Sequence, residues 1–293
     1  MKNFLKNKII IGTRSLSGDL GSVDKKKIFK TIEYSISKGF NHFDTAPFYG
    51  RGFGDEILKN FRKEIIVDTK CGYNSNFTKK TFFTSDINYT LDRALKNFDK
   101  INIFYIHNPR DEVKNWNKII DLMLSLKKEK LIKFSGISLA RGYYFNQKIL
   151  NNFDVIQDDV NVLRNLPLLY LNKFLGKIIS RSVFASGCLS GKLNKSSKFE
   201  KDDYRFDWLK DDRLNSILNQ ISQIKKIHKG DIRKLALGYV LKKKKIKKMI
   251  IGIKNKSHID FLCRNNFSIS NKVVNKIDYL NRNFFSKENM NGY

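Results

Sequence analysis

Four ionisable residues lie at or near the ends of three successive apolar segments. Asp44 ends the first segment and Tyr49 follows five residues later, Lys70 ends the second, and His107 ends the third. A phenol has a pKa of about 10, so a tyrosine that donates a proton at neutral pH needs a nearby cation or polarising network. Lys70 and Asp44 can provide that network. These residue types at consecutive strand ends predict proton-transfer chemistry at one end of a parallel barrel.

The elements that must position these residues repeat along the chain. Eight apolar, β-rich segments alternate with helical patterns, and we expect strands at 9–12, 40–44, 65–69, 101–107, 134–138, 155–157, 177–182 and 249–252. Regular alternation predicts a parallel sheet, and eight repeats predict its closure. We therefore expect an α/β fold, a (β/α)8 TIM barrel. It should form a single domain over residues 1–293, with a short C-terminal tail from about residue 268.

Helix starts and one long loop complete this pattern. Asp24, Ser85 and Asp231 each precede a helical segment and are suitable N-caps. Residues 194–207 are polar and aromatic without a clear period, so we expect an extended loop after the seventh strand. In a barrel that loop lies on the active-site face, where it is a candidate lid over substrate or cofactor.

Cysteine content and the N-terminal segment indicate the cellular compartment of the protein. Cys71, Cys188 and Cys263 are odd in number and lack metal-ligand spacing, which argues against a disulfide framework or a zinc site. The first apolar run is far shorter than the roughly 7–15 residues of a signal-peptide core, and no run approaches a membrane span. We expect a cytoplasmic protein with no membrane partner and no catalytic metal, because carboxylates and histidines do not cluster.

The charge of the chain is extreme. It has 57 basic and 28 acidic residues, a formal net charge of +29. Such a charge suggests a nucleic acid or an anionic membrane as partner. The chain is also rich in Ile, Asn, Phe and Tyr, so a general compositional bias is the alternative, and we expect no specific nucleic acid partner. The run Lys242–Lys248 is expected as a solvated turn on the face opposite the active site.

Three sequence phrases resemble the aldo-keto reductase family. They are HFDTAPFYG at 42–50 with Glu56 downstream, KFSGIS at 133–138, and SRSVFASGCLSGKL at 180–193. The resemblance implies a nicotinamide-dependent carbonyl reductase. In it, Tyr49 is the general acid that protonates the carbonyl oxygen, Lys70 and Asp44 make that phenol more acidic, and His107 orients the carbonyl. The same residues would also catalyse alcohol oxidation.

The resemblance also implies cofactor contacts. Nicotinamide and pyrophosphate contacts fall on Ser138, Gln157, Ser182, Gly187 and Leu189, and the site for an adenosine 2′-phosphate on Lys254, Ser257 and His258. Two segments depart from the family. An Asn usually follows the serine at the position of Ser138, whereas here Leu139 does, and Asn161 is the candidate substitute for the missing amide contact. Phe261 and Leu262 stand where an acid and an amide are expected. NADP(H) is favoured over NAD(H).

Arginines form a pattern of their own. Most basic residues of this chain are lysines, yet several arginines lie at or just after predicted strand ends, namely Arg14, Arg51, Arg110, Arg141, Arg164 and Arg181. Arginine makes planar bidentate contacts with carboxylate and phosphate. We hypothesise an anionic sugar-type or keto-acid substrate held by Arg14, Arg51 and Arg110. Alternatively, some of these arginines cap loops or bind only cofactor phosphates.

Two other functions stay open from sequence. A catalytically weak nicotinamide-binding barrel could act as a regulatory or scaffold subunit, and a polyanion-binding protein could be built on an enzyme fold. The second would need a contiguous basic face and salt-sensitive binding. The favoured prediction is an enzyme acting on a small-molecule carbonyl, as a monomer or small homo-oligomer. Which carbonyl it uses does not follow from the sequence.

Overall fold

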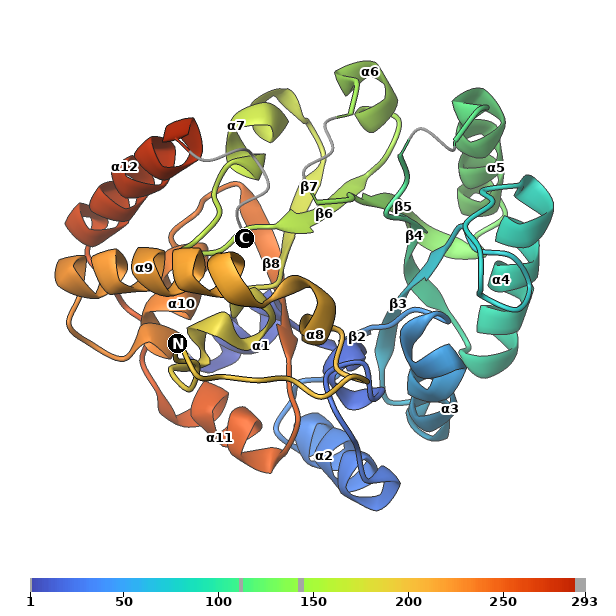
Figure 1. The fold of residues 1–293 in the computed structure, drawn as a ribbon. Coiled ribbons are helices and arrows are strands. Elements are labelled where there is room, and N and C mark those ends of the chain that lie inside the picture. Colours follow the sequence, from blue (N-terminus) through green and yellow to red (C-terminus); the bar gives the residue numbers. More distant parts are fainter. Residues whose placement is uncertain (1, 111–112, 142–144, 288–293) are drawn as a thin grey trace.

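The eight predicted strands form one closed parallel barrel. The structure is a computed structural model that describes residues 2–110, 113–141 and 145–287. Neighbouring strands pair in sequence order and the first pairs with the eighth, so the (β/α)8 barrel is confirmed (Figure 1). The strands are β1 (Ile9–Gly12), β2 (His42–Asp44), β3 (Ile66–Cys71), β4 (Ile101–His107), β5 (Ile132–Ser138), β6 (Val155–Asp159), β7 (Lys177–Arg181) and β8 (Ile246–Gly252).

Among the strand predictions that were too short, those of β6 and β8 share one cause. β8 begins at Ile246, three residues before the predicted start, and β6 extends to Asp159. In both places a charged residue lies inside the barrel or at its end, so the apolar run that marked the strand stops early. The basic run Lys242–Lys248 does connect a helix to the eighth strand, but its last three residues, Ile246, Lys247 and Lys248, are already part of that strand.

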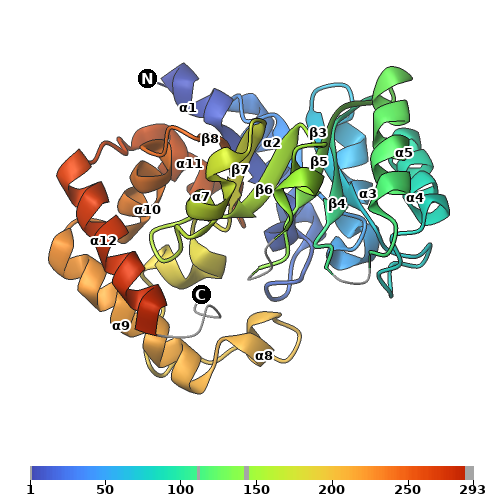
Figure 2. The same ribbon diagram turned by 90° about the horizontal axis from the view of Figure 1, so that it is seen from above.

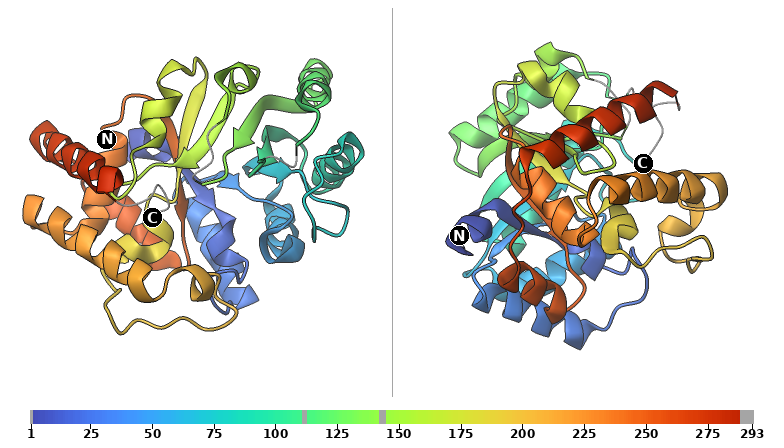
Figure 3. Two further views of the ribbon diagram at one scale, coloured as in Figure 1. Left: turned by 45° about the horizontal axis from the view of Figure 1, so that its top comes forward. Right: turned by 90° about the vertical axis from the view of Figure 1, so that its left-hand side faces the viewer.

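Helices surround the barrel, and α9 and α12 lie side by side on its outside (Figure 3). Their bounds are α1 (Lys2–Lys8), α2 (Lys25–Ser37), α3 (Phe53–Leu58), α4 (Thr84–Asn97), α5 (Trp116–Lys128), α6 (Gln147–Leu150), α7 (Pro167–Tyr170), α8 (Arg205–Trp208), α9 (Asp211–Ile227), α10 (Ile232–Leu241), α11 (Lys256–Arg264) and α12 (Asn271–Lys287). Short 3-10 turns include η1 (Thr13–Leu16), η2 (Tyr49–Gly52) and η5 (Ala185–Ser190).

Two of the three predicted N-caps are confirmed. The carboxylate of Asp24 accepts from the backbone N–H groups of Lys26 and Lys27, and that of Asp231 accepts from the N–H of Arg233. Ser85 is not a cap, because α4 begins one residue earlier and Phe83 precedes it without a side-chain cap. A carboxylate therefore marked these helix starts more reliably than a hydroxyl did.

The segment after residue 268 contains the helix α12 where a short tail was expected. Ile277 and Asn281 on this helix are fully buried. The Asn281 amide donates to the carbonyl of Val162 at 3.0 Å and accepts from Gln220 at 3.0 Å. These contacts attach α12 to α9 and to the loop that follows β6.

The barrel interior has three layers. The middle layer is apolar and consists of Ile10, Ile103, Tyr105, Val155, Ile179 and Ile250, with Phe134 packed against it. Polar side chains lie on both sides of it, at the carboxyl ends of the strands and at their amino ends. Figure 2 shows α1 at the amino ends and α8 beyond the carboxyl ends. In TIM barrels the carboxyl end holds the active site.

Candidate active site

A buried ion pair lies at the carboxyl ends of β2 and β3. The Lys70 ammonium donates to Asp44 Oδ1 at 2.5 Å and to the Thr45 carbonyl at 2.8 Å. It lies 5.0 Å from the centre of the Tyr49 ring. Strand register explains this arrangement: Asp44 pairs with Asp68, so Lys70 projects on the same face two residues further along β3. Three of the four predicted catalytic residues are therefore together.

The turn that carries Tyr49 depends on a glycine. Gly50 has a left-handed backbone, with φ of 53°, and an added Cβ would lie 2.3 Å from the Ser17 carbonyl oxygen. A side chain cannot be accommodated there, because backbone atoms cannot move aside as a flexible side chain can. Gly50 thus allows η2 to pack against the loop after β1, which brings Tyr49 over the mouth of the barrel.

The ion pair keeps Lys70 protonated. Burial by itself lowers the pKa of the ammonium, but attraction to the Asp44 carboxylate and to the Tyr49 oxygen outweighs burial, and the pKa of Lys70 is raised. A permanent positive charge next to a phenol favours the phenolate that forms when the proton is given away. This is the polarising network that the sequence predicted.

His107 is the fourth member of the site. Its ring lies 5.9 Å from that of Tyr49, nearly perpendicular to it, and 5.8 Å from that of Tyr73. Burial, followed by repulsion from nearby lysines and arginines, lowers the pKa of His107 well below its ordinary value. The imidazole is therefore neutral at physiological pH and can donate one N–H to a carbonyl oxygen.

A chain of hydrogen bonds extends from this site across the barrel mouth. Arg181 Nη1 donates to Ser138 Oγ at 2.6 Å, Ser138 Oγ donates to Gln157 Oε1 at 2.9 Å, and Gln157 Nε2 donates to Asp44 Oδ2 at 2.9 Å. Arg181 in turn pairs with Asp159 at 2.7 Å. Both oxygens of Asp44 are therefore occupied, one by Lys70 and one by Gln157.

This chain involves the two residues that were expected to hold a carboxamide. Ser138 and Gln157 lie side by side at the barrel mouth, but their side chains also bind each other and their neighbours. Asn161 is not a free amide: its Nδ2 donates to the Ser182 carbonyl, and its Oδ1 accepts from two backbone N–H groups. The predicted substitute for the missing amide contact thus has a structural role in the loop after β6.

The segment after β7 has an unusual backbone. Ser182, Ala185 and Ser186 all have φ of 52°, and Gly187 has φ of 94°. Left-handed conformations at non-glycine residues cost free energy and cluster at functional sites. The side chain of Leu189 is fully buried in the core, so only its backbone could contact a ligand. Arg205 lies over this segment, and an added Cβ on Gly187 would lie 3.1 Å from its Nη1.

The predicted phosphate-binding residues gather after β8. The backbone N–H of Lys254 donates to His258 Nδ1 at 3.1 Å, and Ser257 Oγ donates to Asn255 Oδ1 at 2.6 Å. Partial burial and three cations, Lys192, Lys254 and Arg233, lower the pKa of His258. The electrostatic potential around His258 is therefore positive. Phe261 packs against Phe267, and Leu262 is buried, so neither offers a polar group to a ligand.

The arginines divide into two groups. Arg14 is half-buried, with its guanidinium 4.2 Å from the Tyr204 ring and 5.9 Å from the Tyr49 ring, and it pairs with Asp19 at 3.5 Å. Arg51 and Arg110 are exposed. The other group lies deeper: Arg141 and Arg181 both pair with Asp159, and Arg164 is buried with its Nε and Nη1 lacking a hydrogen-bond partner.

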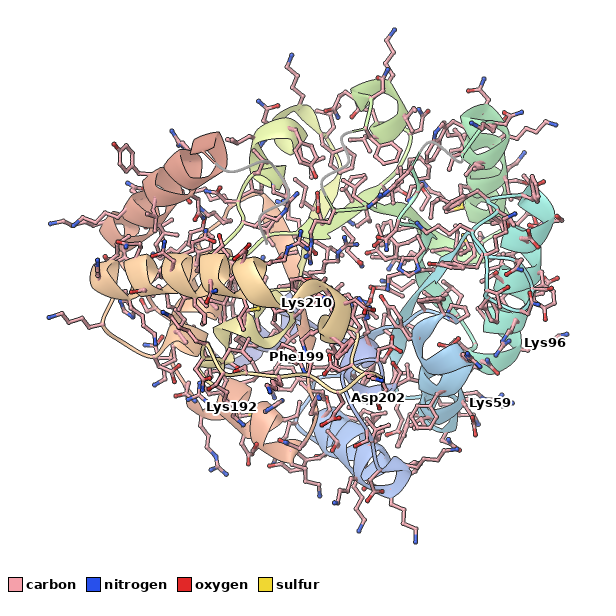
Figure 4. The ribbon with its side chains drawn as sticks, in the orientation of Figure 1. Lys59, Lys96, Lys192, Phe199, Asp202 and Lys210 are labelled. Carbon is pink, nitrogen blue, oxygen red and sulfur yellow. The ribbon has the colours of Figure 1, made fainter. Side chains whose placement is uncertain are left out.

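A strap crosses the barrel mouth between residues 191 and 210. Figure 4 shows Lys192, Phe199, Asp202 and Lys210 along it. The Tyr204 N–H donates to the Asp19 carbonyl at 3.1 Å, and Lys254 Nζ donates to the Leu20 carbonyl nearby. Asp203 pairs with Arg205 at 2.5 Å. The loop expected at 194–207 is thus fastened to the loop after β1.

Sequence reasoning did not select several residues that shape this site. Asp159 is the most important, because it holds Arg141 and Arg181. Its position two residues after Gln157 in β6 was the available signal, since alternate residues of a strand share a face. Lys80, whose ammonium donates to the Asn108 carbonyl at 2.7 Å, and Tyr204 come from loops without a period that could identify them.

Within the described residues, no group of three or more His, Cys, Asp or Glu side chains has the geometry to hold a metal ion. Among the helices of that same part of the chain, none combines the length and the apolar content needed to cross a membrane.

Comparison with known proteins gives consistent matches. A family model described as "Aldo/keto reductase family" matches residues 8–282. L-galactose dehydrogenase of Arabidopsis thaliana is 26% identical over 274 residues, 85% of this chain and 81% of the relative. Aldo-keto reductase YhdN of Bacillus subtilis is 24% identical over 260 residues, 80% and 77% of the two chains. An uncharacterized oxidoreductase of Bacillus subtilis, YqkF, matches over 61% of this chain and 63% of its own length.

Solved structures show the same fold. A glycerol dehydrogenase from Gluconobacter oxydans superposes with a TM-score of 0.76 at 18% identity, covering 97% of this chain and 93% of that one. The holo form of an aldo-keto reductase from Bacillus halodurans superposes with a TM-score of 0.70, also at 18% identity, covering 93% and 91%.

Proposed function

This chain belongs to the aldo/keto reductase family, and we propose that it reduces an aldehyde or ketone to the alcohol with NADPH as hydride donor. One observation carries the proposal. The Lys70 ammonium lies between the Asp44 carboxylate and the Tyr49 ring, with a neutral His107 beside that ring. This arrangement suits transfer of one proton to a carbonyl oxygen while the carbonyl is held in place.

Each residue has a distinct task in this reaction. Tyr49 donates its proton to the carbonyl oxygen as negative charge develops there, and Lys70 stabilises the phenolate that remains. Neutral His107 donates an N–H to the same oxygen and so fixes the direction of the carbonyl. Asp44, held on both oxygens, keeps Lys70 in position. The nicotinamide supplies the hydride when it is bound.

Two features suit a dinucleotide. The backbone at Ser182 and at residues 185–187 has the left-handed conformation that also occurs in anion-binding turns, and Arg205 lies over it. The positive field around His258 suits the additional phosphate of NADPH. Ser182, Gly187 and the backbone of Leu189 would hold the pyrophosphate side, and Lys254, Ser257 and His258 the 2′-phosphate.

The first experiment tests the proton donor. We expect Tyr49→Phe to bind NADPH like the wild type, by fluorescence titration, and to lose at least roughly 100-fold in turnover of small aldehydes, because the proton donor is absent. Phe48→Leu, at the exposed neighbouring position, is the control. Turnover that survives in Tyr49→Phe would rule out the proposed reaction.

Cofactor preference has its own test. Lys254→Met should weaken NADPH binding roughly 10-fold and leave NADH binding unchanged, because the removed ammonium would face the 2′-phosphate. Lys256→Met is a matched control, since its ammonium lies 5.3 Å from the Tyr34 ring and therefore faces α2. Equal losses for both cofactors in Lys254→Met would contradict the assigned phosphate site.

We infer further that the substrate is anionic. Arg14 supports this, because its guanidinium lies beside the proton donor. Arg14→Ala should reduce activity toward acidic carbonyls more than toward neutral aldehydes, whereas Arg51→Ala and Arg110→Ala, at exposed positions, should have smaller effects. Equal effects of Arg14→Ala on acidic and neutral carbonyls would exclude an anion-binding role.

A further inference from the structure

The amino ends of the strands hold a second polar layer that the proposed reaction does not use. His42 is buried, and its Nε2 lies 2.8 Å from Asp68 Oδ2. Asn102 Nδ2 donates to Asp68 Oδ1 at 2.7 Å. The Lys248 ammonium lies 3.0 Å from His42 Nδ1. Strands β2, β3, β4 and β8 thus contribute to one connected group at the end of the barrel opposite the active site.

The acid in this group already has a partner on each of its oxygens. Asp68 accepts from His42 on one oxygen and from Asn102 on the other. The two ring nitrogens of His42 thus connect the Lys248 ammonium to the Asp68 carboxylate. The carboxylate therefore balances one positive charge at most.

More than one positive charge is present. The ammonium groups of Lys177 and Lys133 lie 3.9 Å and 5.6 Å from the centre of the same Phe134 ring. Partial burial lowers the pKa of Lys248, and repulsion from Lys177 and from Lys8 lowers it further, against the attraction of Asp68. The backbone of Lys8, which precedes β1, lies beside that of Lys248 because Ile9 pairs with Met249, and the Lys8 ammonium lies 5.5 Å from the Phe4 ring. We call Lys8, Lys133, Lys177 and Lys248 the lysine opening.

Such a group is unfavourable unless something neutralises it. Like charges that lie close together repel one another, most strongly where they are partly withdrawn from water, as at Lys248. All four members are lysines, which bind as point charges, so they suit a compact oxyanion of high charge better than a planar carboxylate. Lys133 and Lys177 approach one Phe134 ring, and the Lys248 ammonium lies at the same end of the barrel. From this placement, we propose that the lysine opening binds a small phosphate-type anion at the amino end of the barrel.

This site is separate from the cofactor site. The apolar middle layer, with Ile10, Val155, Ile179 and Ile250, lies between the two ends of the barrel. The cofactor phosphates are assigned to the loops after β7 and β8, at the carboxyl ends. A ligand in the lysine opening therefore binds without displacing NADPH, and its binding can be measured whether or not NADPH is present.

Calorimetric titration with tripolyphosphate and with orthophosphate, with and without saturating NADPH, tests the proposal. We expect tripolyphosphate to bind with one site per chain, more tightly than orthophosphate, and with affinity that falls steeply as salt is raised. Lys177→Gln with Lys248→Gln should lose at least roughly 10-fold in affinity. Lys133→Gln with Lys177→Gln, both at exposed positions, should do the same without altering the buried group.

The control removes the same charge elsewhere. Lys242→Gln with Lys244→Gln changes two exposed lysines of the turn before β8 and should leave tripolyphosphate affinity within about 2-fold. Equal losses in control and test variants would mean diffuse charge and would overturn the site. If ATP binds as tightly as tripolyphosphate, a nucleotide is the source of the phosphate group. If binding of RNA or of phosphatidylglycerol vesicles depends on these lysines and binding of tripolyphosphate does not, the proposal is also overturned.

Discussion

The two ends of the barrel interior treat charge differently. At the carboxyl end, Lys70 is paired with Asp44 and Arg181 with Asp159, and the pairs are joined by Ser138 and Gln157. At the amino end, Lys177 and Lys8 repel Lys248, and Asp68 is the buried carboxylate joined to Lys248 through His42 in the part of the chain that the structure describes. Compensated charge holds side chains in one arrangement, whereas uncompensated charge leaves a net field that a ligand can neutralise.

The largest effect is expected at the carboxyl end of the barrel, where the charges are paired. Lys70→Met removes the ammonium beside Tyr49 and should lower turnover roughly 1000-fold, a barrier increase of about 4 kcal/mol. Steady-state kinetics with a neutral aldehyde measures this, and NADPH titration should show little change in binding.

The control for that variant separates chemistry from folding. Asp44 loses its partner in Lys70→Met, so Asp44→Asn with Lys70→Met removes the unpaired carboxylate as well. Circular dichroism should show both proteins folded, and turnover should stay low in both. Turnover close to wild type in either variant would show that the buried pair is not needed for catalysis.

The second test concerns Arg181. Arg181→Met breaks contacts with Asp159, Ser138, Asn108 and the Leu139 carbonyl, and should reduce the free energy of unfolding by roughly 2–3 kcal/mol in urea titrations. Arg141→Met is the matched control, because Arg141 also binds Asp159 but is more exposed. A larger loss in the control would mean that the chain of hydrogen bonds adds nothing to stability.

The third test concerns a carboxyl group beside that chain. Burial raises the pKa of Asp158 to about 7, and Tyr170 donates a hydrogen bond to it. A carboxyl with a raised pKa holds its proton in the folded protein and releases it when unfolded, so it stabilises the fold at low pH. That stabilisation should disappear as pH rises from about 4 to 7.

Asp158→Asn isolates this contribution. We expect the wild type to lose at least roughly 2 kcal/mol of unfolding free energy relative to Asp158→Asn between pH 4 and pH 8. Urea unfolding at intervals across this range measures the difference. His107, whose pKa is lowered, acts in the opposite direction in both proteins and cancels in the comparison. A difference that does not change with pH would show that Asp158 is ionised throughout.

The smallest effect belongs to the amino end. Lys177→Gln removes one charge that repels Lys248, so it should raise the free energy of unfolding slightly, by less than about 0.5 kcal/mol, at low salt. In 1 M salt the gain should vanish because the repulsion is screened. Thermal unfolding at both salt concentrations is the measurement. Destabilisation at low salt would mean that these lysines are balanced by acids, as at the carboxyl end.

Periodicity and residue type predicted the barrel and brought Asp44, Tyr49, Lys70 and His107 to one end of it. Strand ends suffice for this, because parallel strands that close in order bring their carboxyl ends together. The family resemblance is confirmed by the match over residues 8–282. The roles assigned to the four residues, and the contacts with a cofactor, stay predictions.

Other features of the site depend on which charged side chains contact each other, and the sequence does not show this. Arg141 and Arg181 looked like ligands for an anion, but Asp159 lies between them. His42, which the sequence does not connect with either residue, binds Asp68 of β3 and Lys248 of β8. The prediction missed the start of β8 because Lys248, which points into the barrel end, belongs to a run that has the composition of a surface turn. Which charges meet is decided by strand register, and a single sequence does not specify it.

The apolar middle layer of the barrel also has an evolutionary consequence. Ile10, Ile103, Val155, Ile179 and Ile250 separate the two polar layers, so substitutions at one end leave the contacts at the other unchanged. Selection can therefore alter a binding preference at the amino end without altering the reaction, and the reverse. For an engineer, the barrel is a scaffold with two independently adjustable ends, and a library built on the amino-end layer can be screened for new ligands while turnover reports that the protein is folded.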